Sequence, residues 1–350
     1  MISLTLLAYI CYLLKIGVVK KITLKDVSQK TGFTINTVSR ALKDKPDISG
    51  KTKKMICEIA REMGYIPDRI ARSLRDGKTK TIAVIMPDIS DPLIAMWVKD
   101  IEYRLKDYGY GTIIINTDEE YEKEEQSILL ALSTNVDGII LCPTQKSHVD
   151  IDILRNRAIP FVLLGRRFDD DELDYIVSDD VKGGYLATKH LLSKGHKEIL
   201  FLNGPLYISS AKERFLGYLE AFKGENILFD PNLVKEIKVT AGNASRLLEK
   251  IVDEKTKFTA IFAFSDLIAW EVISFLQKIN IKVPEDIAVV GYDNIQSRFF
   301  FPYPLTTVNY SKRNMAIKAV DTLLKIIDNP KKRVAVHIFE ETKLVIREST

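Results

Sequence analysis

The sequence predicts an α/β protein: a small all-α head with a helix-turn-helix, then a large body of two doubly wound parallel-sheet subdomains. The length of 350 residues allows two or three domains. Short capped helices follow one another near the N-terminus, whereas apolar strands alternate with amphipathic helices through the rest of the chain. Charge divides the chain at the same point, because residues 19–80 contain 16 Lys and Arg against 7 Asp and Glu.

This division of charge narrows the classes of function. The whole chain carries only +4, but residues 19–80 carry +9 and Lys15 adds one, which leaves −6 on residues 81–350. A basic head on an acidic body is typical of a polyanion-binding module joined to a second function. With 46% hydrophobic and 28% charged residues, the chain has the composition of a soluble globular protein, which excludes collagen-like and predominantly disordered classes.

The three cysteines indicate a reducing compartment. Cys11, Cys57 and Cys142 lie far apart, and none belongs to a C-x-x-C pair. We therefore expect a cytoplasmic protein that holds no structural metal and no cofactor.

Residues 1–18 differ from the rest of the chain, because they are almost entirely apolar. A membrane anchor is one interpretation, but the apolar run of 14 residues is shorter than the roughly 20 that span a bilayer. A secretory signal is another, but no positive charge precedes the apolar run and no small-residue cleavage pattern comes after it. The favoured interpretation is a start site assigned too far upstream, since a valine codon such as that of Val19 can begin translation. We expect no membrane partner.

The head, residues 20–66, reads as three short helices. The first covers residues 24–30 and ends before Gly32, the second covers residues 35–42, and the third covers residues 51–63. Hydroxyl side chains suited to N-capping precede them, and the first has an acid three residues on, as in a capping box. These caps are Thr23, Thr34 and Ser49.

The first two helices form a helix-turn-helix, in which the second helix enters the major groove of DNA. Val38, Ala41 and Leu42 share its inward face. Asn36, Ser39 and Arg40 fall on the opposite face, where Asn suits adenine and Arg suits guanine. A solvated helical bundle would show the same caps, so the caps alone are weak support.

Longer runs of the sequence support DNA binding more strongly than the helix caps do. The runs TLKDVSQKTGF, TVSRAL, GYIPD and ARSL resemble the head of the LacI/GalR family of bacterial transcription regulators. Ser28, where alanine is usual, and Asp68, where asparagine is usual, are the departures. The resemblance implies base reading by Ile35 and Asn36, with Ile35 suited to a thymine methyl, and a DNA contact by Arg40. It implies phosphate contacts by Thr23, Thr34, Thr37, Ser39, Ser49 and Thr52.

The linker, residues 67–80, resembles the hinge helix of that family. The hinge is too short to be stable alone and folds when two copies meet on DNA. In the family the leucine of A-R-S-L wedges into the minor groove. The resemblance therefore places Ala71 and Leu74 at the DNA.

The body, residues 81–350, alternates short apolar runs with helical segments such as residues 93–108 and 182–194. This alternation predicts parallel sheets covered by helices on both faces. The apolar runs are residues 81–86, 112–116, 137–141, 161–165, 198–202, 260–264 and 287–291.

The body also resembles the family, through runs such as TIAVIMPDISDP, VPEDIAVVGYDN and LVIREST. The resemblance implies a periplasmic-binding-protein-like fold in which the chain crosses between subdomains three times. The N-subdomain would be about residues 81–178 and 311–338, and the C-subdomain about residues 179–310 and 339–350.

Ligands of such sheets bind beyond the carboxyl ends of the strands. Strand ends and the resemblance together place eight residues in an effector site: Asp91, Leu93, Ile94, Arg166, Arg214, Phe262, Asp266 and Asp293. Arginine, carboxylate and aromatic groups suit a polyhydroxylated, sugar-like ligand. Ile208 stands where some relatives have a ligand-binding arginine, which gives no support to a purine-like ligand.

We therefore expect a DNA-binding transcription regulator, of which repression is the commoner outcome in the family, whose affinity for double-stranded operator DNA is set by a small sugar-like effector. No leucine heptad lies near Thr350, so a homodimer is expected. A transporter's solute-binding protein is the alternative, and the basic head argues against it. An enzyme is not expected, because the sequence contains no G-x-S-x-G, Walker, G-x-G-x-x-G or H-E-x-x-H motif.

The hinge interpretation predicts that Leu74→Ala weakens binding to the specific operator far more than binding to unrelated DNA. The wedge acts only where the duplex is kinked, whereas phosphate contacts act on any sequence. Gel-shift titrations with both duplexes measure the two affinities, and an equal loss on both would contradict the wedge role.

Overall fold

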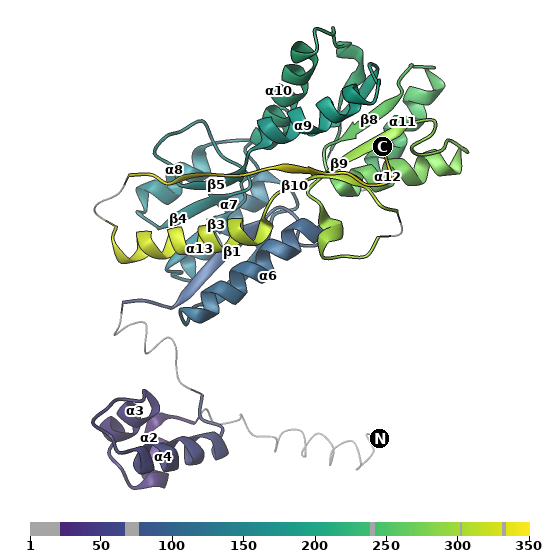
Figure 1. Ribbon diagram of the computed structural model, residues 1–350. Coiled ribbons are helices and arrows are strands. Elements are labelled where there is room, and N and C mark those ends of the chain that lie inside the picture. Colours follow the sequence, from purple (N-terminus) through teal and green to yellow (C-terminus); the bar gives the residue numbers. More distant parts are fainter. Residues whose placement is uncertain (1–21, 67–76, 239–241, 302, 331–333) are drawn as a thin grey trace, which may run out of the picture. The chain divides into compact units, whose positions relative to one another are not determined.

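The computed structural model describes residues 22–66, 77–238, 242–301, 303–330 and 334–350. These residues belong to two compact units, a head that ends at Gly77 and a body over Lys78–Thr350 (Figure 1). The apolar residues 1–18 and the hinge residues Ala71 and Leu74 lie outside the described residues.

The described part of the head contains three helices, with the caps that the sequence predicts. Thr23 and Asp26 form a complete capping box, and Gly32 ends the first helix with φ +74°, a left-handed conformation that favours glycine. Thr34 and Ser49 each accept a backbone N–H at the start of the next two helices. The helices are α2 (Leu24–Thr31), α3 (Ile35–Leu42) and α4 (Gly50–Glu62). Their shared core contains Val27, Val38, Ala41, Ile56 and Ala60.

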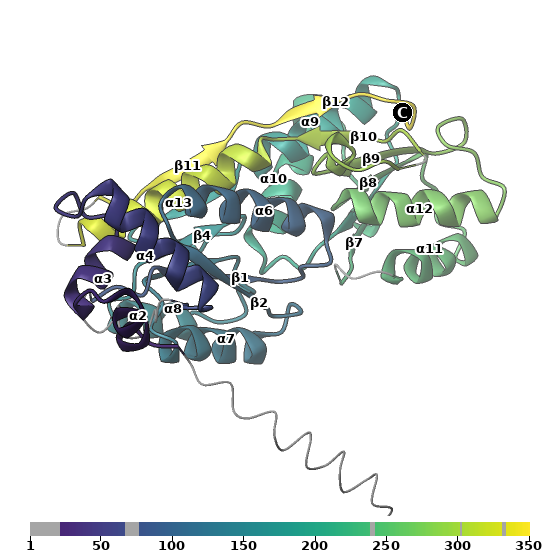
Figure 2. The same cartoon turned by 90° about the horizontal axis from the view of Figure 1, so that it is seen from below.

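The first sheet of the body is entirely parallel and has the strand order β11-β5-β4-β3-β1-β2. Its strands are β1 (Thr81–Met86), β2 (Gly111–Asn116), β3 (Gly138–Leu141), β4 (Phe161–Leu164), β5 (Tyr175–Ser178) and β11 (His337–Glu340). The helices around it are α6 (Pro92–Asp107), α7 (Tyr121–Ser133), α8 (Val149–Asn156) and α13 (Lys312–Asp328). Figure 2 shows α6 and α13 side by side along this sheet.

Helices cover both faces of this sheet, and strand β1 shows why its sequence is a continuous apolar run. Ile82, Val84 and Met86 pack with residues of α6 and α13. Ala83 and Ile85 point to the other face and pack with residues of α7 and α8. All five side chains are fully buried, as the prediction of a two-sided parallel sheet requires.

The second sheet has the order β12-β10-β9-β8-β6-β7, and its strand β12 runs antiparallel to β10. Its strands are β6 (Ile199–Asn203), β7 (Val234–Glu236), β8 (Ala260–Ala263), β9 (Ala288–Tyr292), β10 (Thr306–Asn309) and β12 (Lys343–Val345). Helices α9 (Asp180–Ser193) and α10 (Ser209–Gly224) pack on one face, and α11 (Asn243–Asp253) and α12 (Asp266–Lys278) on the other. Two short 3₁₀ helices complete the subdomain, η1 (Pro231–Leu233) and η2 (Ile295–Ser297).

The chain passes between the two sheets three times: after β5, after β10 and after β11. The last passage corrects a sequence-based boundary. The sequence predicts that the N-subdomain ends near residue 338, but Phe339 and Glu340 still pair with Val177 and Ser178 of β5. The passage therefore lies between Glu340 and Lys343.

Helices α9 and α10 approach each other unusually closely. A Cβ atom on Gly184 would lie 2.2 Å from the backbone oxygen of Arg214, and one on Gly217 would lie 2.0 Å from the backbone oxygen of Val181. Only glycine permits this approach, because real Cβ atoms do not come so near to backbone atoms. The two glycines therefore set the position of α10 relative to the sheet.

Gly217→Ala is expected to destabilise the body by roughly 1–3 kcal/mol, the usual cost of forcing extra atoms into a packed interface. Gly224→Ala is the matched control on the same helix, because no atom lies within 4 Å of its added Cβ. Urea denaturation of the full chain measures both changes. Equal stability of the two variants would show that α9 and α10 are not constrained by this contact.

Candidate functional site

The outward face of the head presents the residues that the sequence analysis assigns to DNA. Asn36 is exposed at the start of α3, and 47% of Ile35 beside it is exposed, although its side chain is a large hydrophobe. The hydroxyl groups of Thr34 and Thr37 lie 2.9 Å apart on the same end of the helix. A similar pair, Ser49 and Thr52, lies 2.8 Å apart at the start of α4, and Thr23 is exposed at the start of α2.

Arg40 has a partner that sequence reasoning missed. Its Nε and Nη2 atoms each donate to the carboxylate of Asp47 at 2.7 Å. The hydrogen bond from Arg40 also lowers the pKa of Asp47. The pair holds the guanidinium group in one orientation on the head surface. Planar bidentate geometry of this kind is usual for arginine with carboxylates.

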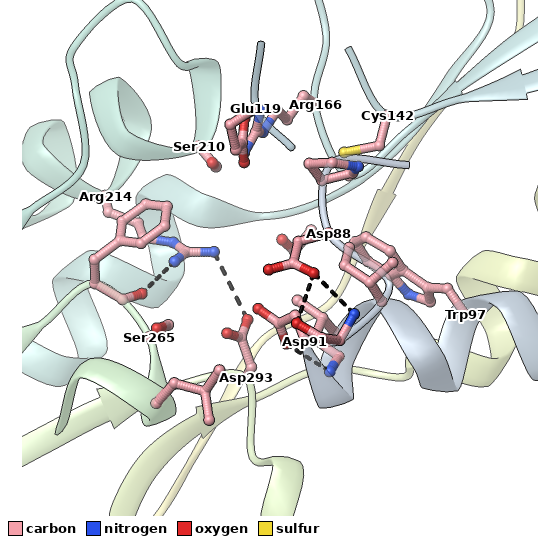
Figure 3. Close-up of a pocket in the computed structure, with 18 of the residues that line it drawn as sticks. Asp88, Asp91, Trp97, Glu119, Cys142, Arg166, Ser210, Arg214, Ser265 and Asp293 are labelled. Atoms are coloured by element: carbon pink, nitrogen blue, oxygen red, sulfur yellow. Dashed lines mark hydrogen bonds and ion pairs between the residues drawn. The ribbon is translucent and has the colours of Figure 1, made fainter. Parts of the chain in front are cut away.

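The body contains a cavity of about 350 Å³ between its two subdomains (Figure 3). This volume lies within the roughly 300–1,000 Å³ usual for small-molecule sites. From the N-subdomain, residues just beyond β1, β2, β3 and β4 reach the cavity. From the C-subdomain, α10 and residues beyond β8, β9 and β10 complete it. The cavity therefore lies at the carboxyl ends of both sheets, as the fold class predicts.

Six of the eight residues assigned to the effector line this cavity: Asp91, Leu93, Ile94, Arg166, Arg214 and Asp293. The other two do not, and the assignment of Phe262 and Asp266 to the cavity wall is corrected. Phe262 is fully buried within β8, where its ring stacks on Phe201 at 4.5 Å, and the strand-end Phe264 lines the cavity instead.

Asp266 has a different environment from the cavity wall. Its Oδ1 accepts a hydrogen bond from the Thr307 hydroxyl at 2.5 Å, and its Oδ2 accepts the backbone N–H of Ile295 at 2.8 Å. Burial and the nearby Asp293 raise the pKa of Asp266 to about 8. The first bond ties Asp266 to β10, and the second fixes the segment after β9, which carries Asp293 into the cavity.

Arg214 is the most enclosed cation of the cavity, with 4% of its surface exposed. Its Nε donates to Asp180 at 2.9 Å, and its Nη1 donates to the backbone oxygen of Phe264. The guanidinium carbon lies 3.5 Å from the centre of the Tyr292 ring. Gly183 makes room for that ring, because a Cβ there would lie 2.0 Å from the Tyr292 hydroxyl.

Asp293 is buried beside Arg214 in a strained backbone conformation. Its φ is +100°, a region that side-chain-bearing residues rarely adopt, and such strain is typical of functional sites. Its Oδ1 accepts the Tyr310 hydroxyl at 2.9 Å and lies 3.9 Å from Nη2 of Arg214. Burial raises the pKa of Asp293, and the charge of Arg214 opposes that rise.

Arg166 is held by Glu119, a residue that sequence reasoning missed. Two nitrogens of Arg166 donate to the two Glu119 oxygens at 2.8 and 2.5 Å, and one also donates to the backbone oxygen of Pro143. Glu119 lies just beyond β2 with φ +58°, so a search of every strand end would have found it. Tyr310 was missed because the strand that precedes it, β10, was not predicted.

Asp91 begins helix α6 at the cavity wall. Its Oδ1 accepts the backbone N–H of Leu93 at 2.8 Å and so caps the helix. Burial, and next the charge of Asp293, raise the pKa of Asp91 from its ordinary value of 3.8 to about 7.

Polar contacts join the two subdomains around the cavity. Arg167 pairs with Glu213 of α10 at 2.6 Å. The Ser209 backbone N–H donates to the side-chain oxygen of Gln145 at 2.9 Å. Arg298 pairs with Asp100 of α6 at 2.8 Å. These contacts tie the C-subdomain to the N-subdomain in the arrangement that forms the cavity.

Two further properties concern only the described residues. No cluster of three or more His, Cys, Asp and Glu among them is arranged to hold a metal ion. None of their helices combines the length and the apolar character needed to cross a bilayer.

Comparison with known proteins relates both units to one family. Residues 23–68 match the model of bacterial regulatory proteins of the lacI family, and residues 79–344 match that of periplasmic binding proteins and the sugar-binding domain of the LacI family. The HTH-type transcriptional repressor PurR of Aliivibrio fischeri is 32% identical over 87% of this chain and 91% of its own length. PurR of Pasteurella multocida is 31% identical over 93% of this chain and 98% of its own length.

Solved structures of transcription regulators resemble the chain over nearly its whole length. A complex of the transcriptional regulator CelR with cellobiose is 26% identical, with a TM-score of 0.72, over 94% of this chain and all of that one. The lac repressor dimer bound to operator and an anti-inducer is 24% identical, with a TM-score of 0.80, over 94% of this chain and 99% of that one, and it supports the fold. The two sheets and the helical head thus match the architecture of these regulators.

Asp91→Asn is expected to stabilise the body more at pH 8 than at pH 5. Asp91 keeps its proton up to about pH 7 in the folded state but loses it near pH 4 in the unfolded state. The native protein therefore loses folding stability as the pH rises from about 4 to 7, and its stability stays reduced at higher pH. Asparagine caps a helix as well as aspartate and has no charge to bury. Melting temperatures at both pH values test this, with Asp152→Asn, at an exposed position of α8, as control. An equal change at both pH values would contradict it.

Proposed function

Because the chain belongs to the LacI family of bacterial regulatory proteins, we propose that it binds an operator as a homodimer and represses transcription under the control of a hydroxylated effector in the cleft. It is a DNA-binding transcription regulator with an effector-binding body. One observation carries the proposal: the chain joins a helix-turn-helix with an exposed polar face to a two-subdomain body that contains a polar cavity.

The DNA contact is proposed for the start of α3. Asn36 would read a base by hydrogen bonds and Ile35 a thymine methyl, while the hydroxyls of Thr34, Thr37, Ser39, Thr23, Ser49 and Thr52 would position the head on phosphates. Arg40 would exchange its ion pair with Asp47 for a contact with guanine or phosphate. Two heads of a homodimer would then occupy half-sites of a pseudopalindrome about one helical turn apart.

The effector is proposed to bind Asp91, Leu93, Ile94, Arg166, Arg214 and Asp293. Aromatic and aliphatic side chains suit the apolar faces of a ring, and the polar groups suit its hydroxyls. A ligand between the subdomains changes their relative positions only through its different affinities for the arrangements. The contacts of Arg167 with Glu213 and of Arg298 with Asp100 are the ones that such a change would break or strengthen.

The runner-up, a solute-binding protein of a transporter, shares the fold of the body. The head argues against this alternative, because a solute-binding protein has no use for a capped helix-turn-helix of net positive charge. The named relatives with whole-length similarity are transcription regulators.

A test begins with selection of duplexes from a random library by the full chain. Affinity for the selected duplex should fall steeply with salt, because several phosphate contacts release counterions. Asn36→Ala should cost about 1–3 kcal/mol on that duplex and leave unrelated DNA unaffected. Cys57→Ser, at an exposed position of α4, is the control. Failure to enrich any sequence, or a complex insensitive to salt, would refute the operator-binding function.

A further inference from the structure

The side chains of the cavity wall include more acidic groups than basic ones. Among the residues that the structure describes, five carboxylates line the cavity against two cationic side chains, Arg166 and Arg214. The carboxylates are Asp88, Asp91, Asp118, Glu119 and Asp293. A ligand that enters this space meets excess negative charge in surroundings of low dielectric constant, where Coulomb forces are strong.

The two arginines are committed to the protein itself. Arg166 is bound on both sides of its fork by Glu119, and Arg214 is bound by Asp180 and by the Phe264 backbone oxygen. Neither guanidinium group therefore offers its full charge to an anionic ligand. Among the acids, Asp118 is also neutralised, by Lys123 at 2.5 Å.

Three carboxylates are left with little compensation: Asp88, Asp91 and Asp293. The Oδ1 of Asp88 accepts from the Ser90 N–H and hydroxyl, and the other two Oδ1 atoms accept from Leu93 and Tyr310. Among the described residues, no hydrogen bond reaches the Oδ2 of any of the three. Figure 3 shows the side chains of Asp88, Asp91 and Asp293 near one another in the cavity wall.

The cations nearest to these three acids compensate their charge only in part. Arg214 lies 3.9 Å from Asp293 and is shared with Asp180. Lys312 is buried behind Tyr310, where its ammonium group donates to the Asn309 side chain and the Tyr310 backbone oxygen. Burial is the main cause that raises the pKa values of Asp91 and Asp293; the charge of Asp293 adds to the rise at Asp91, whereas the charges of Arg214 and Lys312 oppose the rise at Asp293.

A metal ion is not the expected source of the missing positive charge, because no described cluster of carboxylates has the arrangement to hold one. A phosphate group does not fit it either, since it would add charge of the same sign beside three acids. A protonated amine fits, because an ammonium group donates three hydrogen bonds and is buried at low cost when paired with carboxylates. The apolar part of the wall, with Leu93, Trp97 and Phe264, suits a ring carried by the same molecule.

We propose that the effector is a polyhydroxylated compound that carries a protonated amine, of the amino-sugar class, and that its ammonium group binds between Asp88, Asp91 and Asp293. This inference rests on the proposed function, since it takes this cleft as the effector site. It excludes sugar phosphates as the preferred ligands.

The test uses matched probes with the full chain: glucose, glucosamine and glucose 6-phosphate, then galactose, galactosamine and galactose 6-phosphate. Isothermal titration at about pH 7.5 measures each affinity. In at least one set, the amino sugar is expected to bind about 10-fold tighter than the neutral sugar, and the phosphate weaker than both.

Asp91→Asn supplies the second arm. It is expected to weaken binding of the amino sugar about 10-fold more than binding of the neutral sugar, because it removes charge and keeps the helix cap. Asp152→Asn, outside the cleft on α8, is the control. Equal weakening of amine and neutral sugar would mean that Asp91 acts only through structure, and would overturn the proposal.

Two other outcomes also overturn it. One is a neutral sugar or a phosphate that binds tightest in both sets, and the other is no binding by either amino sugar. In both cases gel shifts on the selected operator still report whether the chain is a sequence-specific DNA-binding protein. The failure of the amine inference is thus distinguishable from failure of the proposed function.

Discussion

The close approach of helices α9 and α10 is the contact on which the cavity depends. Gly184 and Gly217 allow the two backbones to meet, and this brings Arg214 on α10 to within 2.9 Å of Asp180, the first residue of α9. The same guanidinium group then lies against the Tyr292 ring and beside Asp293. A buried charge is tolerated only with such partners, so the position of one helix decides whether the charged wall of the cavity can exist.

A second consequence is the sign of the net charge on the cavity wall. The partners that make buried arginines tolerable are carboxylates of this chain, and these carboxylates neutralise the arginines toward any ligand. A ligand therefore meets the remaining acids, chiefly Asp91 and Asp293. The negative charge of the body, which the sequence shows only as a sum over residues 81–350, is concentrated in part where a small molecule would bind.

The cavity also belongs to two subdomains that polar pairs hold together. Arg167 with Glu213 and Arg298 with Asp100 are contacts between separate elements, each of which can part without unfolding either sheet. A ligand that contacts Asp91 on one side and Asp293 on the other adds to the same set of contacts. Ligand binding therefore shifts the equilibrium between arrangements of the subdomains, and the arrangement in turn sets the affinity for the ligand.

The sequence by itself determined the elements whose signals are local. Caps at Thr23, Thr34 and Ser49, and apolar runs such as Thr81–Met86, report the hydrogen bonds and burial of their own segments, so the head and the central strands were predicted correctly. Tertiary structure alone decided the short edge strand β11 and the strand β10. It also decided that Phe262 stacks in the core while Phe264 reaches the cavity, and which acids the arginines neutralise. Those outcomes depend on side chains that are distant in the chain, and neither periodicity nor spacing contains that information.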